Sequence, residues 1–217
     1  NFYYNNCMKN LPEIIPVFPL SGVIYFPKTN LPLNIFEERY LQLVDDCMKS
    51  NKLMGMVQSR RDTNEVYKIG CLGEISHFQK TEDGRALIKL TGITRFQILS
   101  EVNNTKLYRE FKVEYKKFYQ DTESVKIQNY SEEVLEKLFE KIQYFFGKNG
   151  LALNWKEFKL LSQIQQINTL AMISPFSNEE KQKLLETMSL NEKIKILSEI
   201  IEFYLHDKDS AIKAPIQ

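Results

Sequence analysis

The feature that most constrains the fold is a change of hydrophobic period along the chain. From residue 13 to about residue 119, apolar and polar residues alternate between Pro, Gly and Asn pairs, which is typical of strands. Beyond the polar stretch 120–124, apolar residues recur every three to four positions, as in amphipathic helices. We therefore predict an α+β protein with these parts: a β-rich domain over 11–119, a linker over 120–124, a helical bundle over 125–207 and a flexible tail over 208–217.

The β-rich part contains two hairpin signals. Asp83-Gly84 is expected to join a strand over 71–78 to one that starts at Arg85, through a tight turn whose two central residues both take positive φ. Asn103-Asn104 is expected to turn the chain into a last strand. The core face of that strand alternates at Phe111, Val113 and Tyr115.

The strand that follows Arg85 is expected to have one face in the core and one in water, with Gly92 where it bends or bulges. The core face is expected to carry Ile88, Leu90, Phe96 and Ile98. The water face is expected to carry Lys89, Thr91, Arg95 and Gln97.

One helix is predicted among the strands, over about 36–49, with Asn34 and Glu37 capping its first turn. Its apolar stripe, expected to pack on the sheet, comprises Tyr40, Leu41, Val44, Cys47 and Met48. Residues 58–68 have no apolar period and indicate an exposed loop or a pair of frayed strand ends. Ligands often bind at such loops.

Four helices are predicted in the C-terminal part. The first is expected to end at Gly147 in a left-handed conformation. Its buried stripe comprises Val134, Leu135, Leu138, Phe139, Ile142, Phe145 and Phe146. The later starts carry capping pairs: Asn154 with Glu157, Ser177 with Glu180, and Ser189 with Glu192. Ser174-Pro175 separates the second helix from the third, and the last buries Ile194, Leu197, Ile201 and Tyr204.

No constellation of residues predicts catalysis or metal binding. His77 and His206 have no further ligand at metal spacing, so we expect no metal and no cofactor. The cysteines Cys7, Cys47 and Cys71 form an odd set without CxxC spacing, which fits a reducing cytoplasm. Cys47 is assigned a packing role on its helix, and Cys71 lacks a histidine partner for a nucleophilic dyad.

The charge balance and the apolar runs exclude two further classes. With 29 Lys+Arg against 28 Asp+Glu, the net charge is +1, so no global field attracts a polyanion. The longest near-apolar run, Ile14–Pro19, is about a third of the roughly 18 residues that a membrane span requires. Nucleic acid is therefore not the expected partner, and no transmembrane helix is expected.

Several blocks of sequence resemble a known family. Ile14–Phe26 (IIPVFPLSGVIYF), Pro27 and Leu31–Tyr40 (LPLNIFEERY) look like the opening of the Lon N-terminal substrate-binding domain, in particular its short stand-alone bacterial members. Tyr67–Ile75 (YKIGCLGEI) and Gly84–Ile98 (GRALIKLTGITRFQI) are similar to two further blocks of that family. Ser174–Glu186 (SPFSNEEKQKLLE) resembles its helical tail.

The resemblance implies a PUA-like β pseudo-barrel with one helix, followed by a four-helix bundle. It also implies a non-catalytic polypeptide-binding module, an adaptor in protein quality control that lacks the ATPase and peptidase domains of Lon. Its partners would be unfolded or exposed apolar polypeptide segments, and a protease or chaperone. The motif positions that carry the resemblance are Pro19, Pro27, Pro32, Phe36, Glu37, Arg39, Tyr40, Gly70, Gly92, Arg95 and Phe96.

Most of these motif positions are expected to be structural. We predict that Pro27, Pro32, Gly70 and Gly92 shape turns. Phe36, Tyr40 and Phe96 are predicted to fill the core. Arg39 and Arg95 are predicted to pair with a carboxylate or with backbone carbonyls and to pin the helix to the sheet. Client binding is expected in an apolar groove, between the two parts or on the exposed loops of the first.

Two alternative functions stay open at this stage. PUA-like barrels in other families bind RNA, and a basic strip of Lys112, Lys116, Lys117 and Lys126 could serve here, although Glu110, Glu114 and Asp121 dilute it. A small-molecule pocket or a hydrolase is the other alternative, for which the sequence offers no nucleophile with a base.

Overall fold

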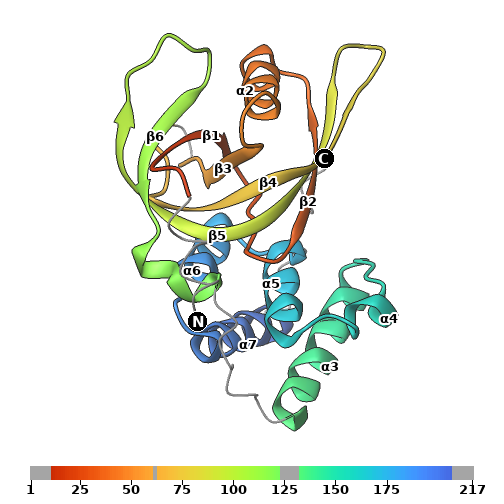
Figure 1. Ribbon diagram of the computed structural model, residues 1–217. Coiled ribbons are helices and arrows are strands. Elements are labelled where there is room, and N and C mark those ends of the chain that lie inside the picture. Colours follow the sequence, from red (N-terminus) through yellow and green to blue (C-terminus); the bar gives the residue numbers. More distant parts are fainter. Residues whose placement is uncertain (1–10, 61–62, 123–131, 207–217) are drawn as a thin grey trace. The chain divides into compact units, whose positions relative to one another are not determined.

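The computed structural model describes residues 11–60, 63–122 and 132–206 (Figure 1). The chain divides into two compact units, residues 1–124 (unit 1) and 125–217 (unit 2). Among the described residues, unit 1 contains every strand and one α-helix, whereas unit 2 is helical. The protein is therefore α+β, as predicted.

Unit 1 is built on one six-stranded sheet. Its strands are β1 (Ile14–Leu20), β2 (Asn30–Ile35), β3 (Leu53–Gln58), β4 (Ile69–Lys80), β5 (Ala86–Val102) and β6 (Arg109–Glu114). The pairs β1–β3, β3–β4, β4–β5, β5–β6 and β6–β1 return to their starting strand, so five strands form a closed sheet. Only β1–β3 is parallel among these pairs. The sixth strand, β2, pairs with the first half of β5.

The core of unit 1 lies inside the closed sheet. Phe96 lies at its centre with no exposed surface, packed with Ile15, Val17, Leu72 and other buried side chains. Phe111, Val113 and Tyr115 are buried, which confirms the predicted alternation of the last strand. Gly70 lies within β4, and a Cβ there would come within 2.4 Å of the Met56 carbonyl oxygen. The prediction that Gly70 shapes a turn is wrong, because this glycine makes room for a neighbouring strand and for Phe96.

Position 92 requires a glycine because two backbone segments approach each other closely there. The sheet register shifts at this point, and a Cβ on Gly92 would lie 2.1 Å from the Phe26 carbonyl oxygen. Phe26 begins a turn in which Pro27 supplies a fixed φ and Lys28 takes φ 64°. Lys28 N–H donates to the Gly92 carbonyl, and Gly92 N–H donates to the Thr29 carbonyl. Pro32, in contrast, lies inside β2 and not in a turn, which suits a strand at the end of the sheet.

The prediction that Arg95 lies on the water face of β5 is wrong. The register shift at Gly92 breaks the simple alternation, so Arg95 is only 4% exposed while Lys89 stays exposed. Its guanidinium donates to both carboxylate oxygens of Asp121, at 2.9 and 2.8 Å, and lies over the Phe118 ring. Asp121 ends the 3₁₀ helix η1 (Lys116–Asp121), so this pair fastens η1 to the sheet. Gln120 and Asp121, which were predicted to begin the linker, are thus the last two residues of η1.

The helix of unit 1, α2 (Glu38–Met48), confirms the predicted helix but not all its details. It buries Tyr40, Leu43, Val44 and Cys47. Its N-cap is Glu37 without a side-chain capping bond, because Asn34 belongs to β2. Phe36 is 68% exposed, so its predicted core role is wrong. It lies at the start of the helix, before the first residue that packs on the sheet.

Two hairpins flank α2 (Figure 1). The β4–β5 hairpin occurs where Asp83-Gly84 predicts it, but its loop spans Thr81–Arg85 and only Gly84 takes positive φ, at 86°. The expected two-residue turn is therefore wrong. The β5–β6 hairpin contains Asn103-Asn104 in a longer loop that ends at Arg109. Ion pairs and hydrogen bonds link both hairpins to α2, through Lys80 with Asp45 and through Tyr108 with Asp46.

Unit 2 shows five helical segments among its described residues: α3 (Glu132–Lys148), α4 (Trp155–Phe158), α5 (Gln163–Ile173), α6 (Asn178–Glu186) and α7 (Leu190–His206). The predicted second helix is two segments, because Ser162 starts a new helix and its N–H donates to the Gln165 side chain at 3.1 Å. The predicted caps at Asn154, Ser177 and Ser189 each accept the expected backbone N–H. The break at Ser174-Pro175 is confirmed.

α3 ends at Lys148, one residue later than predicted, and the left-handed residue that follows it lies three residues later than predicted. Gly150, and not Gly147, takes positive φ, at 66°. Leu151 N–H donates to the Phe146 carbonyl and Gly150 N–H to the Gly147 carbonyl, the pattern of a Schellman motif. On the same helix Val134 is 45% exposed, so its predicted burial is wrong. The buried stripe comprises Leu135, Leu138, Ile142, Phe145 and Phe146.

An aromatic cluster holds unit 2 together. Phe145 of α3 contacts Phe176 and Tyr204, with ring centroids 6.2 and 5.9 Å apart. At the other end of the unit, Trp155 and Phe158 meet edge to face, and Phe158 meets Phe139 in the same way. Trp155 is the single tryptophan of the chain. None of the helices in the described parts of the chain is long and apolar enough to cross a membrane.

Candidate functional site

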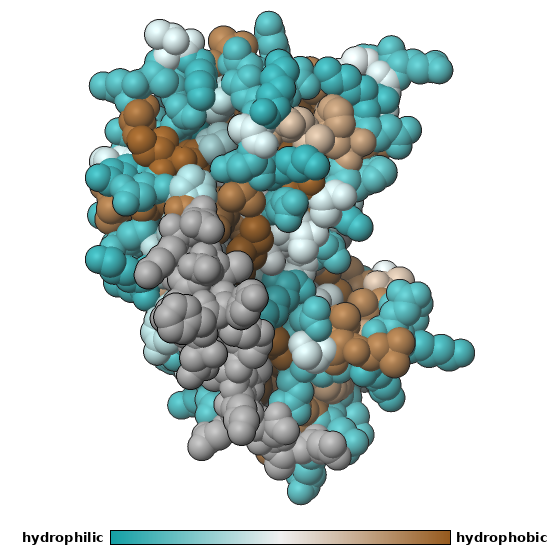
Figure 2. Space-filling view, viewed as in Figure 1, coloured by the Kyte–Doolittle hydropathy of each residue, from teal (hydrophilic) through white to brown (hydrophobic). Residues whose placement is uncertain are grey.

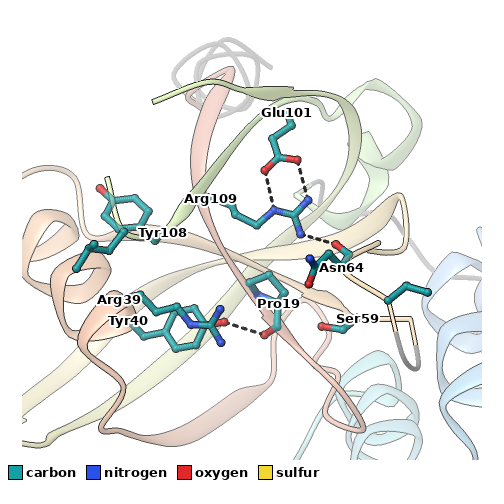
Figure 3. Close-up of a pocket in the computed structure, with 10 residues that line it drawn as sticks. Pro19, Arg39, Tyr40, Ser59, Asn64, Glu101, Tyr108 and Arg109 are labelled. Atoms are coloured by element: carbon teal, nitrogen blue, oxygen red, sulfur yellow. Dashed lines mark hydrogen bonds and ion pairs between the residues drawn. The ribbon is translucent and has the colours of Figure 1, made fainter. Parts of the chain in front are cut away.

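A groove on unit 1 brings together segments that are far apart in the sequence (Figure 3). We name it the α2 groove, and its volume is about 520 Å³. It is formed by the end of β1, the first turn of α2, the loop after β3, the end of β5 and the β5–β6 hairpin. The lining residues are Pro19, Arg39, Tyr40, Ser59, Thr63, Asn64, Glu101, Leu107, Tyr108 and Arg109.

Specific hydrogen bonds hold the walls of the groove in place. The hairpin is tied to α2 because Leu107 N–H donates to Gln42 Oε1 and the Tyr108 hydroxyl donates to Asp46, both at 2.8 Å. The loop after β3 is closed by the bridge between Ser59 and Val66. These contacts hold the β5–β6 hairpin, α2 and the loop after β3 around one groove, although the three segments are far apart in the sequence.

Arg109 is the central charge of the groove. Its Nε and one terminal nitrogen donate to the two oxygens of Glu101, each at 2.7 Å, and its other nitrogen donates to the Asn64 carbonyl at 2.9 Å (Figure 3). These hydrogen bonds lower the pKa of Glu101 below its ordinary value and raise the pKa of Arg109. The guanidinium is therefore neutralised by its own neighbours and fixed in orientation.

Arg39 and Tyr40 form the opposite wall. The Arg39 guanidinium lies 4.5 Å from the centre of the Tyr40 ring and pairs with Glu37 at 2.8 Å. The Tyr40 hydroxyl points to the Pro19 carbonyl, 3.4 Å away (Figure 3). Burial raises the pKa of Tyr40, so its hydroxyl stays a donor at neutral pH. Arg39 does not pin the helix to the sheet as predicted, because its carboxylate partner is exposed and only two residues away.

The groove also has exposed apolar groups. Leu107 lines it and is 54% exposed, although leucine side chains are usually buried. Phe36 is exposed three residues before Arg39, at the start of α2. The site thus offers apolar contact beside fixed polar groups.

The structure divides the predicted motif positions into two sets. Pro19, Arg39 and Tyr40 line the α2 groove, and Glu37 and Phe36 lie next to them in the chain. The others lie within the sheet or its turns: Pro27, Pro32, Gly70, Gly92, Arg95 and Phe96. Sequence reasoning missed Glu101, Tyr108 and Arg109. Their only sequence signal is their position on either side of the predicted Asn103-Asn104 turn.

Among the described residues, no set of three or more His, Cys, Asp or Glu side chains could hold a metal ion. Cys47 and Cys71 are buried, and burial raises the pKa of the Cys47 thiol to about 12. Cys47 therefore stays a neutral thiol at neutral pH, and Cys71 is enclosed in the core with 1% of its surface exposed. Cys7 and Lys126 lie outside the described residues. The chemistry that the groove supports is therefore hydrogen bonding and apolar contact.

Comparison with known proteins gives a consistent match. Residues 14–202 match the family model described as "ATP-dependent protease La (LON) substrate-binding domain". The chain is 24% identical to the Lon protease of Syntrophus aciditrophicus over 95% of this chain and 27% of that protein. It is 29% identical to the Lon protease of Malacoplasma penetrans over 89% of this chain and 26% of that protein. The chain thus spans about a quarter of the curated relatives that it matches.

Two solved structures share the fold. The N-terminal domain of a Mycobacterium avium complex Lon protease aligns with a TM-score of 0.62 at 15% identity, covering 87% of this chain and 98% of that one. A Lon N-terminal domain protein from Xanthomonas campestris aligns with a TM-score of 0.57 at 18% identity, covering 88% and 98%. At these identities the likeness concerns the fold.

Proposed function

The chain belongs to the family of the Lon substrate-binding domain, and from this premise we propose that it is a non-catalytic module that binds polypeptide segments with exposed apolar side chains. We further propose that it acts as an adaptor in protein quality control, with a protease or chaperone as partner. The cytoplasmic location expected from its cysteines stays a prediction.

The proposal extends to the finer architecture. It takes unit 1 as a PUA-like pseudo-barrel over 11–119, whose last helix, η1, extends to Asp121 in the predicted linker over 120–124, followed by a four-helix bundle over 125–207. The closed ring of strand pairs supports the first part of this description. The four helices that exceed one turn, α3, α5, α6 and α7, support the second.

The α2 groove is the observation that carries the proposed function. Three of the positions that carry the family resemblance, Pro19, Arg39 and Tyr40, meet there although they come from β1 and α2. Arg39 has a 54% exposed side chain at this groove, which favours a role in binding, whereas the buried Tyr40 belongs both to the core and to the groove wall.

The groove is suited to an extended client segment. Ser59, Thr63 and Asn64 supply uncharged polar side chains that can bond to a peptide main chain. Leu107 supplies apolar surface for a client side chain, beside the largely buried rings of Tyr40 and Tyr108. Because Arg109 is already paired with Glu101, the groove does not select a client of one charge sign.

The test is a titration of the chain with a fluorescently labelled, permanently unfolded polypeptide. Leu107→Ser should weaken binding by about fivefold, because a half-exposed leucine contributes about 1 kcal/mol of apolar contact. Leu99→Ser is the matched control, since Leu99 is 50% exposed on β5 and does not line the groove.

A second pair of variants addresses the charged wall. Arg39→Ala should weaken binding, and Arg85→Ala should not. The two arginines match closely, because each pairs with a carboxylate two residues earlier and is 54% and 50% exposed, respectively. The proposed function fails if the unaltered chain does not bind the unfolded polypeptide at high micromolar concentration. If the groove variants and their controls weaken binding equally, the α2 groove is not the binding site.

A further inference from the structure

A second groove lies on unit 2, between α3 and the segment that leads into α5. We name it the α3 groove, and its volume is about 690 Å³. Its lining residues are Leu135, Glu136, Phe139, Glu140, Gln143, Lys159, Leu161, Gln163 and Gln166. Those of α3 recur at the spacing of one helix face. Figure 2 shows apolar side chains beside hydrophilic ones on the face of unit 2 that this view presents.

The floor of the α3 groove is apolar. Leu135 is buried, and Phe139 is held edge to face against Phe158, with ring centroids 5.3 Å apart. Leu161 faces them from the other side of the groove. An apolar side chain of a partner would gain contact here.

The α3 wall carries two carboxylates that the described residues do not neutralise. Glu136 and Glu140 are exposed and take part in none of the ion pairs within residues 11–60, 63–122 and 132–206. The neighbouring lysines of the same helix are already engaged, Lys137 with Glu133 and Lys141 with Glu202. Lys159 is the single cation among the lining residues, which leaves the groove with an excess of one negative charge.

The opposite wall contains an amide oxygen that requires a donor. Gln163 Oε1 is buried and accepts no hydrogen bond from the described part of the chain. Its neighbour Gln166 is already used, since its amide donates to the Phe158 carbonyl at 3.1 Å. A buried acceptor without a donor costs about 1–3 kcal/mol. Because this oxygen has almost no exposed surface, an N–H group of a partner would reach it once the Gln163 side chain rotates towards the groove.

We propose that the α3 groove is a second contact site for client polypeptides and takes an extended segment in which an apolar side chain neighbours lysine or arginine. The apolar side chain lies on Phe139 and Leu161, and the cation lies between Glu136 and Glu140. An N–H group of the segment donates to Gln163 Oε1 after rotation of that side chain. This proposal rests on the proposed polypeptide-binding function and adds a charge preference that the α2 groove does not provide.

Two labelled unstructured peptides test it. They share one apolar core, flanked by lysines in the first and by glutamates in the second, and are titrated at 50 mM and 150 mM salt. The lysine-flanked peptide should bind about fivefold more tightly at the lower salt concentration, because two partly exposed charge contacts contribute about 1 kcal/mol together. The difference should shrink at 150 mM salt.

Charge-matched variants test whether the preference for the lysine-flanked peptide arises at the α3 groove. Glu136→Gln with Glu140→Gln should abolish it, whereas Glu192→Gln with Glu199→Gln, which removes the same charge from exposed positions of α7, should preserve it. Lys159→Gln should increase it, since this change removes the only cation that lines the groove. All the substituted side chains are exposed, and Trp155 fluorescence checks that unit 2 remains folded.

The outcomes separate this proposal from the function on which it rests. If both peptides bind equally well, or if the preference survives in the Glu136→Gln, Glu140→Gln variant, the α3 groove is not the site while polypeptide binding stands. If neither peptide binds the unaltered chain, both proposals fail. Loss of the preference in the α3 variant alone supports the assignment.

Discussion

The two units differ in where their charged side chains find partners. In unit 1, Arg95 is buried against Asp121, and Arg109 is bound by Glu101 at the edge of the α2 groove. In unit 2, aromatic contacts hold the fold, and two carboxylates on the α3 groove have no ion-pair partner among the described residues. Unit 1 therefore uses its charges to fix its own structure, whereas unit 2 leaves charge available to a partner.

The largest expected effect concerns the buried pair of unit 1. Arg95→Met should lower the free energy of unfolding by about 4 kcal/mol, because it leaves the Asp121 carboxylate buried without its partner. Chemical unfolding followed by circular dichroism measures the change. The double variant Arg95→Met, Asp121→Leu should recover much of the loss, and a single-variant loss below about 1 kcal/mol would contradict the structural role given to this pair.

The corresponding change in unit 2 is apolar. Ile142→Ala should cost about 3 kcal/mol, since this fully buried side chain leaves a cavity within the α3 interface. Val134→Ala on the same helix should cost under about 0.5 kcal/mol, because Val134 is 45% exposed. Trp155 fluorescence during unfolding follows both variants in unit 2. Similar losses for the two would show that the burial assigned along α3 is incorrect.

Alkaline pH should weaken unit 1. Burial raises the pKa of Cys47 from 9.0 to about 12, so the folded state keeps the neutral thiol after the unfolded state has ionised. The stabilisation is complete below pH 9 and is lost as pH rises towards 12. At pH 10 the loss from this thiol alone should be about 1 kcal/mol. Unfolding measured from pH 8 to pH 11 should show a shallower decline for Cys47→Ala, and an identical decline would refute this origin.

The smallest expected effect concerns the charge preference of the α2 groove, which one substitution should create. Glu101→Gln should cost less than about 1 kcal/mol of stability, because the pair with Arg109 is exposed to solvent. It frees the Arg109 guanidinium, so the glutamate-flanked peptide should gain about twofold in affinity. Peptide titrations with this variant measure the gain. If binding of both peptides is unchanged, the neutralisation of Arg109 has no role in client selection.

Much of the fold could be predicted because its signals are local. The alternation at Phe111, Val113 and Tyr115, the hairpin at Asp83-Gly84 and the caps at Ser177 and Ser189 all depend on residues a few positions apart. Each local rule describes one backbone segment and its nearest neighbours, so it holds whatever the rest of the chain does. The α2 helix follows for the same reason.

The predictions that were wrong concern residues whose burial or conformation depends on contacts beyond their own segment. Arg95 was assigned to water from strand parity, but the register shift beside Gly92 and a carboxylate 26 residues away decide its burial. Phe36 was assigned to the core from its type, but it precedes the packed face of α2. Gly150 replaces Gly147 as the left-handed residue because α3 continues through Gly147 to Lys148.

The sequence by itself determined the α+β class, the family, the places of the two hairpins and most of the caps, because periodicity and capping act between neighbours in the chain. Only the tertiary structure decided which charges meet. Arg109 with Glu101, Tyr108 with Asp46, and Phe139 opposite Leu161 depend on closure of the sheet and on helix packing. Both grooves arise from such long-range contacts, whose geometry is set by the whole of each unit.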